Sequence, residues 1–245
     1  MRPSLQGFWG KGTAANRGTP PEDGGLSDVL IVYDPATFWT SIGAGEALQA
    51  SFDSLIINIS ARENTAGYAV TVLTSYYSFL SADLSKYAHI WDIPFATDIP
   101  NSVGLKYLSY LQTGGAVFLL GENSGFNIRN QGICNIVSVA GGGTITVSTL
   151  EPTNVLTTIL EPEFLLKNNN NIVTFYAPGD FRVIGSGTPM MSGFPTAQMP
   201  AVMWKTESLV NAPKGAIVSV LDINFLSSHL QPNFIDNIAI CLNKK

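Results

Sequence analysis

Short apolar runs alternate with segments of helical spacing from Asp28 onward. The runs are rich in Val, Ile and Leu and end at polar residues or glycine, which is typical of strands buried on both faces of a parallel sheet. Between them, apolar residues recur at intervals of three and four, as on one face of a helix. The pattern predicts core strands at 29–34, 69–75, 88–93, 116–122 and 215–222, and helices near 44–52 and at 102–115 and 232–244. This alternation predicts a doubly wound, mainly parallel α/β sheet with helices on both faces.

The pattern changes between about 143 and 205. The apolar runs become shorter, and β-branched residues, glycine and proline increase, which favours antiparallel strands. Candidate strands are 143–148, 171–177, 181–187 and 201–205, and the polar run 168–171 is predicted as an exposed turn. We therefore expect one α/β domain over 28–245 that carries a β-rich insertion or edge extension.

Residues 1–27 are rich in glycine, proline and polar residues and show no periodicity. This composition predicts an extended arm outside the core. The arm carries Phe8 and Trp9, and aromatic side chains on such segments are suited to anchor contacts with another protein. We expect protein partners, above all self-association of the chain through this arm.

Composition narrows the class of partner further. The 245 residues include 13 basic and 18 acidic ones, and the charged fraction of 13% is about half of that common in soluble domains. Without a basic cluster, binding to nucleic acid is not expected.

No apolar run is long enough for a membrane span, and the N-terminal residues lack the apolar run of a signal peptide. Cys134 and Cys241 are predicted as buried free thiols, and the compartment stays open, with an extracellular or virion-associated setting slightly favoured.

The predicted strand 116–122 leads into the sequence LLGENSGF, a strand-to-turn-to-helix junction with glycines at 121 and 125. Together with the run GAIVSVLDINFLSSHLQPNFIDNIAICL, this junction resembles the class I glutamine amidotransferase-like superfamily and the related ThuA-like and flavodoxin-like domains, over residues 28–245. The resemblance implies their α/β fold. It also implies a G-x-C-x-G turn that holds a nucleophilic cysteine above the sheet.

The chain departs from that motif at the nucleophile. The central position is Asn123, and an amide does not form acyl intermediates. Ser124 lies one residue beyond the elbow position of the hydrolase motif G-x-S-x-G. The histidine pair of the family is matched only by His229-Leu230-Gln231, in which glutamine replaces the orienting carboxylate. No catalytic residue is therefore predicted in the degenerate elbow Gly121, Glu122, Asn123, Ser124 and Gly125, and the alternative is a triad of Ser124, Asp222 and His229.

The sequence of the elbow also predicts its backbone geometry. Gly121 and Gly125 are expected to be required by the backbone, because a Cβ there would clash or force an unfavourable φ. Asn123 is expected to cap the turn or to tolerate a left-handed backbone.

Four carboxylates fall at the predicted C-terminal ends of core strands, where open α/β sheets bind ligands: Asp34, Asp92, Glu122 and Asp222. A ring of such acids could hold Ca²⁺ or Mg²⁺ or activate water. The same residue types also favour strand-to-turn junctions for local hydrogen bonds. Arg129 could bind a ligand carboxylate, or form an internal pair with Glu122 or Asp92. No cofactor is predicted, and Ca²⁺ or Mg²⁺ is the alternative.

These observations favour a non-catalytic amidotransferase-like domain that acts as a structural or interaction module in a larger, extracellular or virion-like assembly. The alternative is a hydrolase or glycan-binding protein that uses the strand-end carboxylates with a divalent cation.

Overall fold

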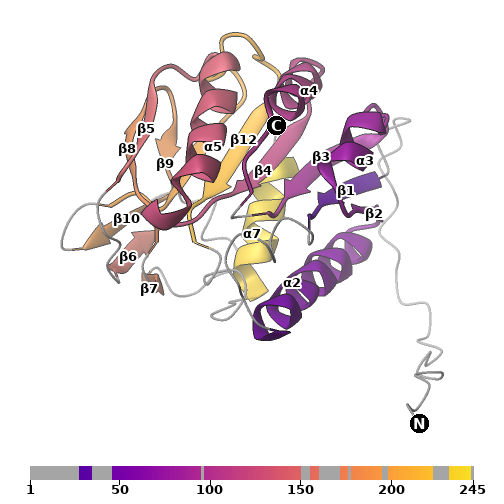
Figure 1. The fold of residues 1–245 in the computed structure, drawn as a ribbon, viewed down its shortest axis with the longest axis horizontal. Helices are drawn as coiled ribbons and strands as arrows, with labels where there is room; N and C mark the ends of the chain where they lie inside the picture. Colours follow the sequence, from indigo (N-terminus) through magenta and orange to yellow (C-terminus); the bar gives the residue numbers. More distant parts are fainter. Residues whose placement is uncertain are drawn as a thin grey trace.

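A computed structural model of the chain describes residues 28–34, 46–94, 97–149, 155–159, 172–175, 178–194, 198–222 and 232–243. Its centre is a seven-stranded sheet in the order β2-β1-β3-β4-β12-β11-β9 (Figure 1). The strands are β1 (Asp28–Val32), β2 (Ala69–Leu73), β3 (Tyr87–Asp92), β4 (Ala116–Leu120), β9 (Thr188–Pro189), β11 (Ala201–Trp204) and β12 (Ala216–Val220). The five strands from β2 to β12 in this order are parallel, and β11 and β9 add antiparallel neighbours. The predicted fold class is confirmed.

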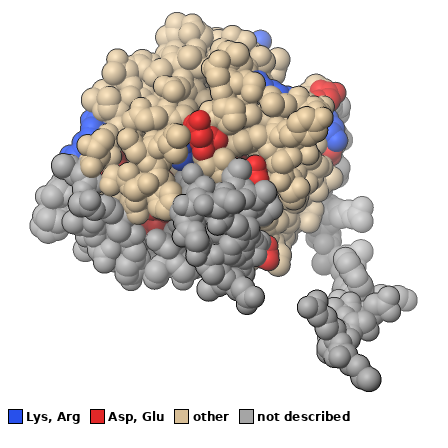
Figure 2. Space-filling view, viewed as in Figure 1, with Lys and Arg blue, Asp and Glu red and all other residues tan. Residues whose placement is uncertain are grey.

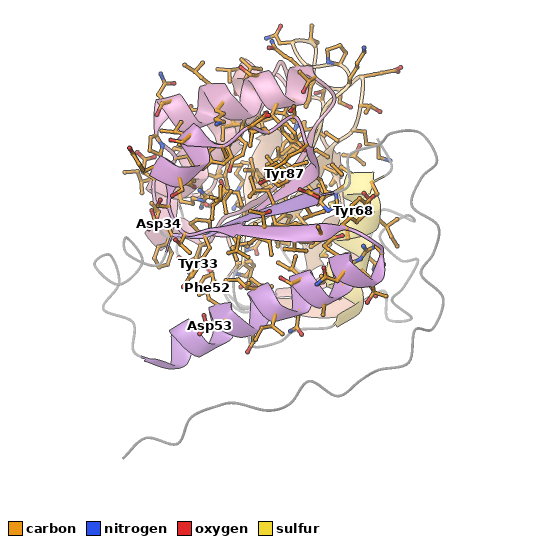
Figure 3. The ribbon with its side chains drawn as sticks, turned by 90° about the vertical axis from the view of Figure 1, so that its right-hand side faces the viewer. Tyr33, Asp34, Phe52, Asp53, Tyr68 and Tyr87 are labelled. Atoms are coloured by element: carbon orange, nitrogen blue, oxygen red, sulfur yellow. The ribbon has the colours of Figure 1, made fainter. Side chains whose placement is uncertain are left out.

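Helices cover both faces of the sheet. The helices α2 (Glu46–Thr65) and α7 (Pro232–Asn243) lie on one face (Figure 1). The helices α3 (Tyr76–Ser81), α4 (Asn101–Gln112) and α5 (Asn127–Val139) lie on the other. Two apolar clusters follow from this arrangement, and the strands contribute alternate residues to each. On the α2 side, Tyr33 and Phe52 stack with ring centroids 5.4 Å apart (Figure 3).

Strand β3 brings polar side chains to both faces of this sheet. All six of its residues are buried. His89 and Trp91 point to the α2 side, and Asp92 points to the α3, α4 and α5 side, because side chains alternate along a strand. Two buried polar groups on opposite faces of one strand are the main departure from an apolar sheet core.

The strands between α5 and β12 pair antiparallel, as predicted, but they are distributed over three sheets. Strands β5 (Ile145–Val147) and β8 (Phe181–Ile184) form one pair, and β6 (Val155–Ile159), β7 (Ile172–Phe175) and β10 (Met191–Phe194) form a three-stranded sheet. The predicted strand 201–205 is β11, which pairs with β12 in the main sheet. The arm 1–27 and the predicted turn 168–171 lie outside the described residues.

Among the described helices, none combines the length and the hydropathy that crossing a membrane requires.

Candidate functional site

The four predicted strand-end carboxylates are all buried: Asp34, Asp92, Glu122 and Asp222. Asp34 lies at one end of the strands and Tyr68 at the other (Figure 3). Within the described ranges, no group of three or more His, Cys, Asp or Glu side chains is arranged to hold a metal ion. Among the described residues, these acids are therefore not gathered into the cation-binding ring that the sequence left open as an alternative. Asp92 and Glu122 are instead engaged by separate local donors.

Asp92 and Arg129 form a fully buried ion pair, which is one of the two internal pairs suggested for Arg129. Arg129 Nη2 lies 3.0 Å from Asp92 Oδ1. Its Nε donates to the carbonyl oxygen of Leu120 at 2.8 Å, and its Nη1 donates to Tyr76 Oη at 2.6 Å. One guanidinium on α5 thus connects β3, β4 and α3.

Two tyrosine hydroxyls complete this cluster. Tyr107 Oη donates to Asp92 Oδ2 at 2.6 Å, and Tyr76 Oη lies 3.2 and 3.3 Å from the two carboxylate oxygens. Both oxygens of Asp92 therefore have partners inside the protein. We call Tyr76, Asp92, Tyr107 and Arg129 the closed cluster, because Asp92 and Arg129 are completely shielded from solvent.

Burial controls protonation in the closed cluster. Burial raises the pKa of the Asp92 carboxyl, against the opposing effects of Arg129 and the tyrosine hydroxyls. Burial lowers the pKa of Arg129, but Asp92 and the two tyrosines outweigh this effect and the pKa is raised. The pKa values of Tyr76 and Tyr107 are raised, mainly by burial. Arg129 remains a cation and both tyrosines remain neutral at ordinary pH.

The turn after β4 leads through the short 3-10 helix η1 (Ser124–Phe126) into α5. Asn123 caps it, since Asn123 Oδ1 accepts from the Gly125 N–H at 2.9 Å. The Asn123 N–H donates to Glu122 Oε1 at 2.8 Å, and Asn130 Oδ1 accepts from the Glu122 N–H at 3.1 Å. Local hydrogen bonds therefore fix the backbone of the elbow.

The elbow confirms one glycine prediction, corrects the other, and shows which of the two roles expected for Asn123 is present. A Cβ on Gly121 would lie 2.6 Å from Asn130 Oδ1 and closer still to Leu221, so only glycine fits. A Cβ on Gly125 would meet only the end of the Asn123 side chain, at 3.0 Å from Oδ1, and Gly125 does not have a positive φ. Asn123 has φ −64° and ψ −179°, which is extended and not left-handed backbone. Of its two expected roles, Asn123 therefore has the capping one.

The alternative triad is only partly placed. Ser124 is partly exposed in η1, and Asp222 is buried just after β12. His229 lies outside the described residues. The two cysteines, Cys134 and Cys241, are free and buried, as predicted.

Sequence reasoning missed a second buried polar cluster on the other face of β3. Glu63 Oε1 lies 2.9 Å from His89 Nε2 and accepts from Trp91 Nε1 at 3.1 Å. Glu63 Oε2 accepts from Arg62 Nη1 at 3.0 Å, and Arg62 Nε donates to Asp236 Oδ1 at 3.2 Å. We call these five residues the open cluster, because Arg62 and Asp236 reach solvent. The available signal was a carboxylate at position 63, in line with the apolar stripe of Phe52, Leu55 and Ile59.

A surface cavity of about 450 Å³ lies beside the open cluster, between α2 and α7. Its lining includes Arg62 and Asp236, which already bind each other. The other lining residues are Asn58, Ala61, Thr65, Ala66 and Ile235.

No protein-family model and no curated protein matches the sequence. The structure is similar to a ThuA-like protein from Bacteroides uniformis ATCC 8492, with a TM-score of 0.58, 13% identity and coverage of 94% of each chain. It is also similar to the mmIFT52 N-terminal domain, with a TM-score of 0.60, 14% identity and coverage of 89% of this chain and 98% of that chain. A ThuA-like protein from Parabacteroides merdae ATCC 43184 matches with a TM-score of 0.53, 10% identity and coverage of 90% and 91%. At these identities the likeness concerns the fold, and it confirms the ThuA-like α/β fold expected from the sequence.

Proposed function

We propose that the chain is a non-catalytic amidotransferase-like domain that serves as a structural or interaction module in a larger assembly. The observation that carries the proposal is the use of Asn123. At the position where the family resemblance implies a nucleophile, this side chain caps the turn by accepting from the Gly125 N–H. An amide engaged in this way positions backbone and attacks nothing.

The surroundings of the elbow support the same conclusion. Asp92 and Arg129 are fully buried and hold each other, so neither contacts a substrate. Burial raises the pKa of the Cys134 thiol to about 11, which keeps it in the unreactive protonated form at neutral pH. Neither the ion pair nor the thiol is therefore suited to react with a substrate.

The surface supports a role in protein contacts. Lysine, arginine, aspartate and glutamate are sparse on the face seen in Figure 2. Large apolar side chains are exposed on several elements, including Ile57, Tyr77 and Ile128, which are 64%, 82% and 60% exposed. The fold itself assigns no activity, because it is shared by ThuA-like proteins and the mmIFT52 N-terminal domain.

Chemical labelling tests the non-catalytic part of the proposal. The full-length chain and its Asn123→Ala and Ser124→Ala variants are treated with a fluorophosphonate probe and with iodoacetamide. We expect the same labelling in all three. Labelling that disappears only in Ser124→Ala would contradict the proposal and support a serine hydrolase.

Photo-crosslinking tests the assembly part. A photoreactive residue replaces Trp9 in the purified full-length chain, because the arm is proposed to fasten one copy to another. We expect cross-links to a second copy. Cross-links confined to one chain, together with a monomer mass of 26.2 kDa at high concentration, would contradict it.

A metal titration distinguishes the alternative function. A ligand that binds the native state raises its melting temperature. A rise with Ca²⁺ or Mg²⁺ would favour the hydrolase or glycan-binding protein with strand-end carboxylates. We expect no rise.

A further inference from the structure

Strand β2 forms one edge of the seven-stranded sheet. Its sequence, AVTVL, contains no charged residue and no proline. Val72 on this strand is 39% exposed, and the neighbouring helix α3 exposes Tyr77 to 82% and Leu80 to 40%. An uncharged, β-branched edge strand with exposed apolar neighbours is a template for pairing with another strand.

The backbone groups that face outward from β2 follow from its pairing with β1. The Tyr33 N–H donates to the Leu73 carbonyl oxygen at 2.8 Å, so the polar groups of Leu73 point toward β1. Because these groups alternate sides along a strand, those of Ala69 and Thr71 also point toward β1. The N–H and C=O groups of Val70 and Val72 therefore point away from the sheet.

The opposite edge of the same sheet is built differently. Strand β9 has only two residues, Thr188 and Pro189. Short length and proline are two of the means by which proteins block an edge strand. Within the part of the chain that the structure describes, the sheet is therefore protected at β9 and open to pairing at β2.

We propose that β2 pairs antiparallel with β2 of a second copy, about a two-fold axis that passes beside Thr71. In this register Val70 of each copy faces Val72 of the other, and each pair exchanges both N–H···O=C hydrogen bonds. Thr71 faces Thr71 of the second copy. The sheet then continues from one copy into the next, and the exposed Val72 side chains lie within the interface.

The second copy is the occupant that fits this edge. A two-fold axis places residues near the axis next to their own copies, so a charged residue there would meet a like charge. None of the five residues of β2 is charged. The axis also brings the outward N–H and C=O groups of Val70 opposite those of Val72 in the second copy. An identical strand therefore satisfies all of these groups. This inference deepens the proposed self-association and rests on it.

A charge placed on the edge tests the proposal in the full-length chain. Val72→Lys puts an ammonium group opposite Val70 of the second copy and diagonally across the axis from the same ammonium group of that copy, so it should lower the sedimentation mass two-fold, from two chains to one. Val210→Lys is the matched control, since Val210 is 77% exposed in the connection between β11 and β12, and it should remain dimeric. A monomeric parent chain, or equal masses for the two variants, would overturn the inference.

A cysteine pair tests the register and does not depend on how Val72→Lys folds. Facing residues of a non-hydrogen-bonded antiparallel pair have Cα atoms about 4.5 Å apart, within reach of a disulfide. Mild oxidation with diamide should therefore link Thr71→Cys into a dimer, and Thr74→Cys should link far less, because position 74 faces position 68. Equal linkage of the two variants, or linkage of neither, would contradict the register.

The outcomes separate this inference from the proposed function. If Trp9 cross-links to a second copy while Val72→Lys has no effect on mass, the module assembles without the β2 edge. If Val72→Lys dissociates the dimer but Ser124-dependent labelling is found, the edge pairing stands and the non-catalytic function fails.

Discussion

The closed and open clusters lie on opposite faces of one strand, and they stabilise buried charge in different ways. In the closed cluster, Asp92 receives hydrogen bonds from a cation and two hydroxyls that are all inside the protein. In the open cluster, Glu63 is completely buried, but Arg62 is 18% exposed and its second partner, Asp236, is 37% exposed. The strand is the same, and the difference comes from the helices that cover it.

The closed cluster stabilises the elbow by connecting the elements around it. Its members come from β3, α3, α4 and α5, and Arg129 also binds the last residue of β4. A buried charge with only internal partners is costly to leave unpaired. These contacts therefore hold the end of β4, which leads into the elbow, against its neighbours.

The polar groups of the open cluster are less completely hydrogen-bonded than those of the closed cluster. Glu63 as a carboxylate only accepts hydrogen bonds, so His89 Nε2 donates to it. The other ring nitrogen, His89 Nδ1, has no hydrogen-bond partner among the described residues, and Tyr68 packs edge-on against the ring at 5.5 Å. The charge of Glu63 is balanced by an arginine that solvent reaches, so salt screens this cluster more than the closed one.

Removing the cation of the closed cluster should have the largest effect. Arg129→Met leaves the Asp92 carboxylate buried without its cation, and we expect a loss of about 3–5 kcal/mol in the free energy of unfolding. Urea unfolding measures it. Arg182→Met is the control, since Arg182 pairs with Asp180 at 2.8 Å but is 44% exposed, and it should cost about 1 kcal/mol or less.

The double variant Arg129→Met, Asp92→Leu sharpens this test. It removes both charges, so it should recover a large part of the loss. If Arg129→Met lowers the free energy of unfolding by less than about 1 kcal/mol, the ion pair does not stabilise the elbow.

Neutralising the centre of the open cluster should have a smaller effect. Glu63→Gln keeps an oxygen acceptor for His89 or Trp91 but removes the carboxylate that Arg62 binds. We expect a loss of about 1–3 kcal/mol in urea unfolding. Glu207→Gln, at an exposed acid, should change stability by less than about 0.5 kcal/mol. An equal effect of the two variants would mean that the open cluster contributes no buried interaction.

The sequence predicted the fold better than it predicted these clusters. Strands buried on both faces carry dense apolar and aromatic residues, so β1, β3, β4 and β12 could be found from the sequence. The strands β6 and β10 could not, because short antiparallel strands carry weaker patterns.

The site residues also differ in how far the sequence could predict their contacts. Arg129 and Asp92 could be suggested as partners because Asp92 falls at a predicted strand end and Arg129 follows the elbow after the next strand. Glu63 and His89 could not, because their contact depends on which turn of α2 packs over which residue of β3, and that is decided by tertiary packing. Gly125 was expected to be required by its backbone, but its φ is ordinary and only the packing around Gly121 demands glycine.

Alkaline pH should distinguish the two clusters, since only the closed one contains tyrosines that take part in its hydrogen bonds. Burial raises the pKa of Tyr107, so the folded state keeps a proton that the unfolded state releases above about pH 10. Stability is unaffected below that pH and falls above it, by about 1.4 kcal/mol per pH unit for each such group. Urea unfolding at several alkaline pH values measures the slope.

Two variants check the origin of that slope. Tyr107→Phe should make it shallower, and Tyr77→Phe, at an exposed tyrosine, should leave it unchanged. Native Tyr107 that ionises near pH 10, as seen in the tyrosinate absorbance lost in Tyr107→Phe, would contradict the explanation.

The smallest effect is expected at the solvent end of the open cluster. Asp236→Asn removes the charge that Arg62 Nε meets at 3.2 Å, while Glu63 still holds Arg62 Nη1 at 3.0 Å. Because Asp236 is partly exposed, the loss should be about 1 kcal/mol or less, and it should shrink further as salt is added. Urea unfolding of both forms at low and high ionic strength measures this difference. A loss above about 2 kcal/mol that salt does not reduce would show that Asp236 is part of a buried network, and the contrast between an open and a closed cluster would then be wrong.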